Sequence, residues 1–267
     1  MTTSAQVNPS QKYLTDGFYL ADYPVLPKAD VDAAVVGMDE VRGGRNDRGR
    51  AHNGSNLTPG DDPNKLCKIE QPQFANQAIF DLISDADLGA LAANLTGAKM
   101  VQVWWVQLLY KPPTSPDVDA HTKVGWHQDR HYWTSWKKNS ILLTAWVALS
   151  DVGADCGPMK FLRGSHRWGQ QEGLSDFFGQ NLDEQRRAIE AEGQAWDEVP
   201  ALLPAGGVSF HDRLTFHGSE ANLSARPRRS LAIHMRTERS WPDPDNPHEL
   251  TSFIDQPELC PIVFGST

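Results

Sequence analysis

Two patterns of hydrophobic and polar positions divide the chain near residue 100. Before this point, apolar residues recur every three or four positions, which is the spacing of a helix with one buried face. This pattern predicts helices at 27–41, 74–82 and 85–95, the last capped by Ser84 and ended by Gly97. After it, β-branched and aromatic residues form short runs that are typical of strands. The predicted strands lie at 101–110, 125–128, 142–149, 159–162, 207–210 and 230–236, with 68–70 as a shorter candidate.

Turn residues separate these strands, and a surface helix predicted at 180–192 interrupts them. Many short strands after a helical first part favour a closed double-sheet jelly roll, which is a mainly β fold with packing α-helices. The chain has no internal repeat and no linker, so we expect a single domain over 1–267. Residues 1–10 are polar and are predicted to be disordered.

The segment 42–64 is rich in Gly, Asn, Asp and Pro, and it predicts a long loop. If this loop were a lid, it would present four arginines to an anionic substrate: Arg42, Arg45, Arg48 and Arg50. A solvated surface loop is the simpler interpretation, and we favour it because long loops have either role.

Composition narrows the class of protein. A formal net charge of −9 disfavours a nucleic-acid partner. No apolar run is long enough to span a bilayer, and the first residues lack a secretory signal, so we expect neither a membrane partner nor export. The three cysteines, Cys67, Cys156 and Cys260, are far apart, which indicates free thiols in a reducing compartment. A cytoplasmic location is therefore expected, and the oligomeric state is left open.

Candidate chemistry centres on G-W-H-Q-D-R-H-Y-W at 125–133. His127 and Asp129 are two residues apart, so in an extended strand both side chains face one point. With one more histidine they would form the two-histidine, one-carboxylate triad that holds non-haem Fe(II) with open positions. His217 is the candidate third ligand, and His211 is a competitor six residues before it. Arg228 follows His217 by eleven residues and suits a carboxylate, which its guanidinium can bind at both oxygens.

Five segments carry a resemblance to a known family. They are L-L-Y-K-P-P (108–113), G-W-H-Q-D-R-H-Y-W (125–133), A-W-V-A-L-S-D-V (145–152), C-G-P-M-K-F-L-R-G-S-H-R-W-G (156–169) and F-H-G-S-E-A-N-L-S-A-R-P-R-R-S (216–230). In this order they resemble the phytanoyl-CoA dioxygenase family of Fe(II)/2-oxoglutarate-dependent oxygenases. The resemblance implies a double-stranded β-helix, a cupin-like jelly roll, with helices on one side. It also implies Fe(II), the co-substrate 2-oxoglutarate and O2 as the cofactors, with succinate and CO2 as products.

The resemblance also implies roles for individual residues. It makes His127, Asp129 and His217 the iron ligands, and Arg228 the partner of the far carboxylate of 2-oxoglutarate. More weakly, it places further co-substrate contacts at Ser219, Trp146, Gln107 and Lys68, while His131, Trp133 and Arg130 are candidates to contact the substrate. Because halogenating relatives lack the carboxylate that Asp129 provides, we expect hydroxylation of a small molecule of specialised metabolism. Desaturation, ring closure and epoxidation remain open.

Two other functions use the same residues. A jelly-roll protein could hold zinc with this triad in a hydrolase or isomerase site. A protein of this fold could also be a binding module without catalysis. A zinc hydrolase would not require Arg228 or Ser219, and the intact triad with Arg228 argues against a binding module. Consumption of 2-oxoglutarate separates both alternatives from the oxygenase.

Overall fold

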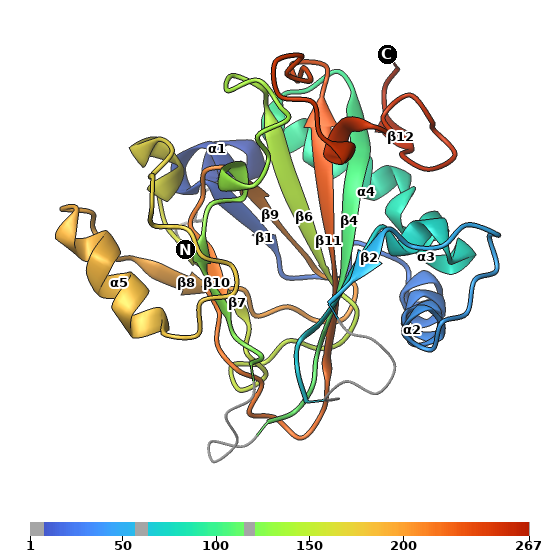
Figure 1. The fold of residues 1–267 in the computed structure, drawn as a ribbon, viewed down its shortest axis with the longest axis horizontal. Coiled ribbons are helices and arrows are strands. Elements are labelled where there is room, and N and C mark those ends of the chain that lie inside the picture. The colour runs from blue at the N-terminus through green and yellow to red at the C-terminus, as the bar shows by residue number, and fades with distance from the viewer. Residues whose placement is uncertain (1–7, 57–63, 115–120, 267) are drawn as a thin grey trace, which may run out of the picture.

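Two antiparallel sheets face each other in the computed structural model, which describes residues 8–56, 64–114 and 121–266 (Figure 1). The larger sheet has the order β1-β9-β6-β11-β4-β3-β2, and β12 pairs with β4 at its end. Its strands are β1 (Phe18–Ala21), β2 (Gly54–Ser55), β3 (Cys67–Glu70), β4 (Val101–Lys111), β6 (Leu142–Ala148), β9 (Val208–Asp212), β11 (Arg228–Thr237) and β12 (Ile262–Phe264). The smaller sheet has the order β5-β10-β7-β8 and comprises β5 (Val124–His127), β7 (Met159–Leu162), β8 (Glu198–Pro200) and β10 (His217–Ser219). The expected jelly roll is confirmed.

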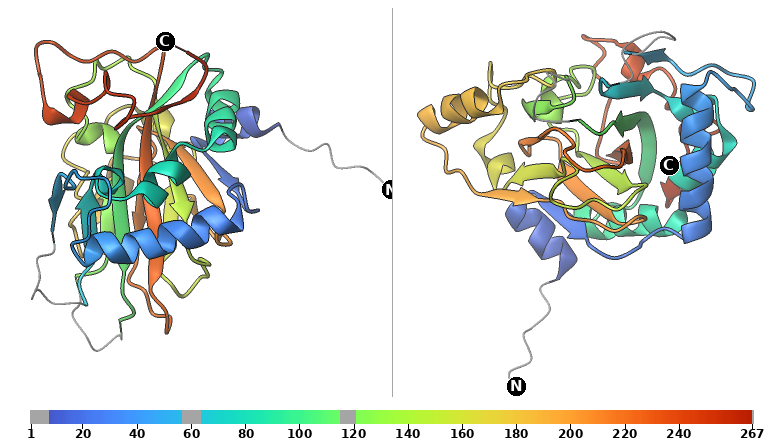
Figure 2. Two further views of the ribbon diagram at one scale, coloured as in Figure 1. Left: turned by 90° about the vertical axis from the view of Figure 1, so that its right-hand side faces the viewer. Right: turned by 90° about the horizontal axis from the view of Figure 1, so that it is seen from below.

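Helices cover the outer face of the larger sheet. They are α1 (Pro9–Asp16), α2 (Lys28–Arg42), α3 (Gln77–Ile83) and α4 (Ala86–Thr96), and α2 runs across the strands (Figure 2). α5 (Leu182–Ala191) lies beside the smaller sheet, and short 3-10 turns η1 to η4 span Pro72–Phe74, Asp129–His131, Ser165–Trp168 and Glu249–Thr251. In the described residues no helix is long and apolar enough to cross a membrane.

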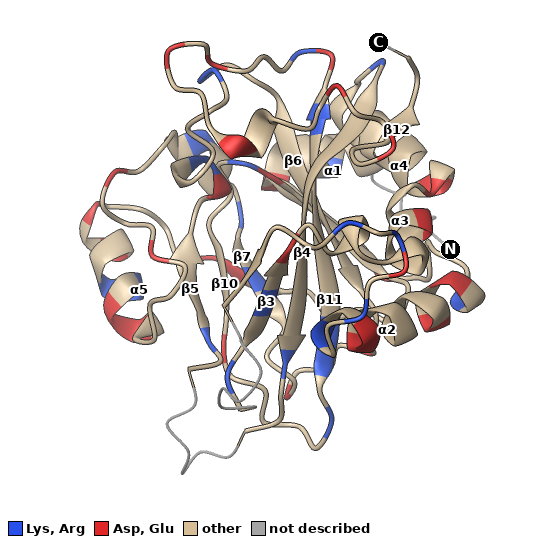
Figure 3. Ribbon diagram, turned by 45° about the vertical axis from the view of Figure 1, so that its right-hand side comes forward, with Lys and Arg blue, Asp and Glu red and all other residues tan. Residues whose placement is uncertain are grey.

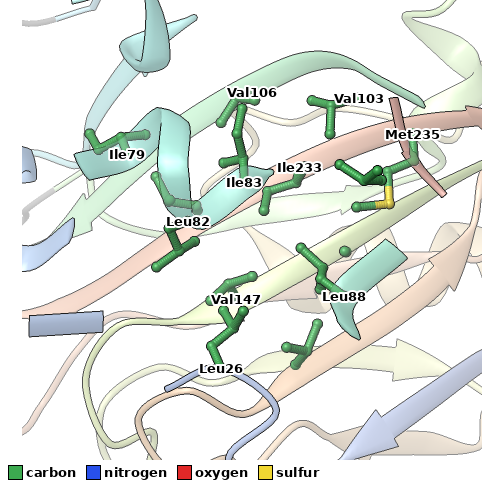
Figure 4. Close-up of a cluster of buried hydrophobic side chains, with 14 of the residues drawn as sticks. Leu26, Ile79, Leu82, Ile83, Leu88, Val103, Val106, Val147, Ile233 and Met235 are labelled. Carbon is green, nitrogen blue, oxygen red and sulfur yellow. The ribbon is translucent and has the colours of Figure 1, made fainter. Parts of the chain in front are cut away.

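The main hydrophobic core lies between these helices and the larger sheet. Leu82 and Leu88 of α3 and α4 are buried against Val106, Ile233 and Met235 of the sheet (Figure 4). Burying each such side chain contributes about 1.5–3 kcal/mol relative to exposure. Charged residues lie mainly on the helices and connecting loops, with some on the strands (Figure 3). The apolar contacts that stabilise the larger sheet thus lie mainly on its outer face, and its inner face can carry polar groups.

The register of the larger sheet aligns the residues that face inward. β11 lies between β4 and β6, and its positions 228, 230, 232 and 234 share one face because strand residues alternate. One row of directly opposed residues runs His211, Thr144, His234, Trp105. A second runs Ser209, Trp146, Ala232, Gln107, Glu70, and at the end of β11 Arg228 opposes Lys111. Residues from five strands are thereby brought to one inner surface.

Several local predictions need correction. The second of the two adjacent helices is capped by Asp85, whose carboxylate accepts from the Leu88 N–H, because Ser84 instead ends the helix before it. The predicted disordered segment 1–10 is helical from Pro9, since Asn8 accepts the Ser10 N–H and Pro9 has the fixed φ of a first helical residue. Residues 1–7 lie outside the described residues.

The predicted loop 42–64 is irregular through 43–53, then forms the short strand β2, and its part 57–63 lies outside the described residues. Its described arginines hold neighbouring structure. Arg48 donates to the carbonyl oxygens of Gln73 and Glu258, and Arg42 stacks 3.5 Å from the centroid of the Tyr110 ring. None of the four arginines lines the cavity described below. The described part therefore fits the surface-loop interpretation that we favoured.

Candidate metal centre and co-substrate cavity

His127, Asp129 and His217 come together at the inner face of the smaller sheet. Their candidate ligand atoms all lie within 4.8 Å of one another, and the three residues are buried. His127 ends β5 and His217 begins β10, where the two residues are paired directly. The Nε2 atoms of His127 and His217 lie 3.8 and 3.7 Å from Oδ1 of Asp129. The strand ends at His127, and Asp129 begins a 3-10 turn, but extended Gln128 between them keeps both side chains on one side.

Backbone carbonyls orient both imidazole rings. Nδ1 of His127 lies 2.8 Å from the Gly125 carbonyl oxygen, and Nδ1 of His217 lies 2.9 Å from that of Thr215. A carbonyl oxygen only accepts, so each Nδ1 carries the proton and each Nε2 presents a lone pair. Metal-binding histidines are commonly oriented in this way. The two Nε2 atoms and one carboxylate oxygen therefore form a donor set that fits Fe(II) on one face.

The second oxygen of Asp129 is held by the polar row of the larger sheet. Oδ2 accepts from Thr144 Oγ1 at 2.7 Å and from His211 Nε2 at 3.2 Å. Thr144 in turn lies 2.9 Å from Nδ1 of His234, which must donate because the threonine proton goes to Asp129. His211 Nε2 donates its proton in a hydrogen bond to the Asp129 carboxylate, so this nitrogen has no lone pair available for a metal ion. The geometry thus favours His217 over the competitor His211.

Electrostatics keep the ligand set in its metal-binding protonation states. Burial lowers the pKa of His127 below its ordinary value, and burial followed by repulsion from the neighbouring His127 lowers the pKa of His217 further. Burial acts to raise the pKa of Asp129, but attraction to His217 and the hydrogen bond from His211 outweigh it and hold that pKa well below its usual range. Neutral imidazoles and an ionised carboxylate are the forms that bind metal.

A cavity of about 310 Å³ opens beside the triad between the two sheets. Besides the triad, it is lined by all five residues that the sequence singled out for the co-substrate: Lys68, Gln107, Trp146, Ser219 and Arg228. Aromatic side chains make up much of the remaining wall: Trp105, Tyr132, Trp133, Phe177 and Phe178. The cavity is thus large enough for small molecules and lies directly against the metal ligands.

One end of the cavity is cationic. Arg228 is 2% exposed, and its guanidinium lies 5.2 Å from the centroid of the Trp146 ring. Nη1 donates to the Gly157 carbonyl oxygen, while Nε has no partner among the described atoms. Burial lowers the pKa of Arg228 to about 10, so the side chain stays charged at neutral pH. Ser219, two residues after His217 on β10, lines the same cavity. A buried guanidinium with spare donors fits a carboxylate ligand.

Lys68 and Gln107 lie on a different part of the wall and interact with the same side chain. Lys68 Nζ pairs with Glu70 at 2.6 Å, and Gln107 Nε2 donates to Glu70 at 3.4 Å. Glu70 also accepts from Trp105 Nε1 at 2.6 Å, and Lys68 lies 4.9 Å from the centroid of the Phe177 ring. The charge of Lys68 is therefore already compensated within the wall.

The three candidate substrate residues separate in space. Trp133 lines the cavity, whereas Arg130 and His131 do not. Arg130 is buried and donates to the carbonyl oxygens of Trp133 and Trp136, so it fixes the turn that carries Trp133. His131 is partly exposed, and its ring contacts Tyr132 at 4.8 Å. Of the three, the geometry leaves Trp133 in position to contact a substrate.

Sequence reasoning missed the residues that support Asp129. Thr144 and His234 belong to no motif, and the sequence assigns them only to strands. Their one detectable signal is a polar residue inside an otherwise apolar strand, as in L-L-T-A-W and A-I-H-M. A polar residue that a strand buries needs a partner: for Thr144 the partner is the Asp129 carboxylate, and for His234 it is Thr144.

The family follows from the sequence as a whole. The family model described as phytanoyl-CoA dioxygenase matches residues 14–230, which is more than half of the chain. The chain belongs to the phytanoyl-CoA dioxygenase family. A curated relative from Stutzerimonas stutzeri, described as a probable alpha-ketoglutarate-dependent hypophosphite dioxygenase, is 28% identical over 184 residues. That match covers 66% of this chain and spans 59% of the length of the relative.

Solved structures share the fold of this phytanoyl-CoA dioxygenase family member. The epimerase SnoN from nogalamycin biosynthesis, in complex with Fe3+, alpha ketoglutarate and nogalamycin RO, matches with a TM-score of 0.70 and 22% identity over 91% of this chain and 87% of that one. The carbocyclase SnoK from the same biosynthesis matches with a TM-score of 0.69 and 20% identity over 90% and 87%. EvdO2 from Micromonospora carbonacea var. aurantiaca, complexed with 2-oxoglutarate, matches with a TM-score of 0.60 and 17% identity over 94% of this chain and 97% of that one. These likenesses establish the fold.

Proposed function

We propose that the protein is an Fe(II)- and 2-oxoglutarate-dependent dioxygenase that hydroxylates a C–H bond of a small organic molecule. The observation that carries the proposal is the buried triad of His127, Asp129 and His217 in one cavity with Arg228, a buried cation that has no carboxylate partner among the described residues. When bound, Fe(II) and 2-oxoglutarate supply the oxidising chemistry: the keto acid becomes succinate and CO2, and one oxygen atom of O2 passes to the substrate. Zinc-hydrolase and binding-module functions give the buried Arg228 no role.

Each residue has a distinct task in this proposal. His127, Asp129 and His217 hold the metal and leave its other side open. Arg228 and Ser219 bind the far carboxylate of 2-oxoglutarate, because a carboxylate in a buried cavity needs charge and donors. Trp146 forms the wall under the guanidinium. Lys68 and Gln107 act through the Glu70 cluster at the wall, which we assign to the substrate side of the cavity.

The wall favours an organic substrate with an apolar ring or chain. Trp105, Trp133 and Phe177 offer broad apolar faces, and such faces with a few polar groups are usual for small-molecule sites. Lys68 is paired with Glu70, and we assign Arg228 to 2-oxoglutarate, so among the described lining residues no further Lys or Arg is left unpaired for an inorganic oxyanion. We therefore do not transfer the hypophosphite of the curated relative to this chain. One domain and a cytoplasmic location, in keeping with three buried free thiols, complete the proposal.

Anaerobic titration of the Fe(II)-loaded protein with 2-oxoglutarate tests the cofactor chemistry. We expect the weak visible charge-transfer band of the metal–keto acid chelate in the wild type and its loss in Asp129→Ala. The matched control is Asp16→Ala, because Asp16 is as buried as Asp129, 6% exposed in each case, but pairs with Arg163, and neither of these two residues lines the cavity. Absence of the band in folded, metal-loaded wild type would refute the proposal.

Substrate screening in air tests the remaining parts. Compounds that stimulate succinate formation should yield a product heavier by one oxygen atom, measured by mass spectrometry. A product lighter by two hydrogens would replace hydroxylation by desaturation. Stimulation by hypophosphite, with phosphite as product, would refute the assignment of an organic substrate.

A further inference from the structure

Lys111 is a buried cation to which neither the triad nor the cavity wall gives a role. It ends β4 and is 0% exposed. Its Nζ donates to Ser219 Oγ at 2.7 Å and to the Glu220 carbonyl oxygen at 2.5 Å. The carboxylate of Glu220 pairs with Lys123 at 3.3 Å instead. Within the described residues, no carboxylate lies at ion-pair distance from Lys111, and an uncompensated buried ammonium is costly.

A second uncompensated cation lies directly beside it. Arg228 opposes Lys111 in the antiparallel register of β11 and β4, so the two side chains leave the sheet on the same face. Like charges at such positions repel each other. In the described part of the chain Arg228 has no carboxylate partner either, and its donor contact is the Gly157 carbonyl oxygen. Burial, then repulsion from Arg228, lowers the pKa of Lys111 well below its ordinary value. The repulsion between these two cations is reduced when an anion binds next to them.

The direction of the hydrogen bonds shows where that anion would bind. An ammonium group has three donors and no acceptor, so Ser219 Oγ accepts from Lys111. The hydroxyl proton of Ser219 is therefore free to point elsewhere. Ser219 and Arg228 line the cavity, whereas Lys111 lies behind Ser219. The cavity end thus offers a hydroxyl donor and a guanidinium side by side, with a second positive charge behind them.

We propose that Lys111 is a positioning residue for the far carboxylate of 2-oxoglutarate. It holds the Ser219 hydroxyl in the donor orientation and adds positive charge to the end of the cavity that Arg228 occupies. This inference rests on the proposed function and adds to it a residue that does not line the cavity. The bound carboxylate in turn compensates the repulsion between the two cations.

The test compares two keto acids in the Lys111→Met variant of the Fe(II)-loaded enzyme. 2-Oxoglutarate carries the far carboxylate, and 2-oxopentanoate has the same chain length with a methyl group in its place. By anaerobic calorimetry, we expect Lys111→Met to weaken 2-oxoglutarate binding about 10- to 100-fold, the range for a lost hydrogen bond to a charged group, and to leave 2-oxopentanoate binding unchanged. Lys123→Met is the control, because it removes a nearby but partly exposed positive charge.

Each other outcome has a definite meaning. An equal loss for both keto acids, or no loss for either, would overturn the inference, since a purely structural lysine would not distinguish the far carboxylate. A wild type that binds neither keto acid would instead refute the proposed function. If Lys111→Met does not fold, Ser219→Ala decides, because it keeps the bond from Lys111 to the Glu220 carbonyl. Full preference for 2-oxoglutarate in Ser219→Ala would overturn the inference.

Discussion

Replacing Thr144 by valine tests whether the polar row of the larger sheet sets the direction of the metal carboxylate. Thr144 is 1% exposed, and valine preserves its shape while removing the hydroxyl. The change deletes the 2.7 Å bond to Asp129 Oδ2 and leaves the Nδ1 proton of His234, now 2.9 Å from the hydroxyl oxygen, without an acceptor. Asp129 then keeps the 3.2 Å bond from His211 as the support of Oδ2.

The size of the effect follows from these two contacts. A hydrogen bond to a charged group contributes about 1.5–3 kcal/mol and a neutral one about 1 kcal/mol, so the metal-free protein should lose about 3 kcal/mol of unfolding free energy. Loss of a partner that orients a metal ligand typically reduces metal affinity about 10- to 100-fold. We therefore expect weaker Fe(II) binding in a protein that still folds.

The assay is anaerobic competition for Fe(II) with a chelator of known affinity, alongside urea denaturation. Thr237→Val is the control, because Thr237 is also buried and bonds the Ile141 carbonyl oxygen at 3.3 Å, away from the metal ligands. It should lose stability but keep Fe(II) affinity. Unchanged Fe(II) affinity in folded Thr144→Val would refute the claim that the hydroxyl orients Asp129.

Three further predictions concern other parts of the site. Arg228→Met should raise the Kd for 2-oxoglutarate about 10- to 100-fold in calorimetry, because the far carboxylate loses a charged donor; an unchanged Kd would move the anchor to another arginine. Burial lowers the pKa of His234 from 6.5 to about 4. Between pH 6.5 and 4 this histidine is therefore protonated in the unfolded chain but neutral in the folded protein, so the free energy of unfolding falls as the pH is lowered through this range. His234→Gln should therefore lose about 2 kcal/mol less unfolding free energy than wild type between pH 7.5 and pH 5 in urea titrations, and an equal loss would contradict the burial argument. Gly125→Ala should lower stability by about 1–3 kcal/mol in thermal denaturation, because the added Cβ would lie 2.1 Å from the Asp176 carbonyl oxygen, and an unshifted Tm would show that this segment yields freely.

Two matched variants control these measurements. Arg229→Met removes the neighbouring arginine, which pairs with Asp39 at 3.1 Å outside the cavity, and should leave the Kd for 2-oxoglutarate unchanged. Gly54→Ala adds the same methyl group at a position with nothing within 4 Å and should leave the Tm nearly unchanged.

The sequence predicts the sheets well because their strands are strongly apolar. The run at 101–110 reads as a strand from its β-branched and aromatic residues, and β4 extends it by one residue to Lys111. β10 is different, since His217–Ser219 is three residues long and offers no alternation to detect. It exists because both of its edges pair with other strands, which is a tertiary effect. Short strands of this kind are beyond local pattern reading.

The metal ligands are accessible to sequence reasoning, while their surroundings are not. His127 and Asp129 stand out by a spacing that any extended segment converts into proximity. Thr144 and Lys111 carry no such spacing, because their partners lie in strands that are distant in the chain. Arg130 is a further case: its position next to the triad motif predicts a substrate contact, whereas in the structure its donors hold two backbone carbonyls. The register between strands determines which of these side chains meet, and this register cannot be read from one sequence alone.

The orientation of the two imidazole rings has a consequence for how this scaffold diversifies. Each ring is held by a main-chain carbonyl group two residues before it, that of Gly125 or Thr215, and main-chain groups persist whatever side chain a position carries. Mutations in the aromatic wall can therefore accumulate without disturbing the histidine donors. The metal-binding centre can therefore stay constant while the surface that contacts the substrate varies. Variant libraries in which Trp105, Trp133 and Phe177 are randomised should retain metal binding in most members that fold.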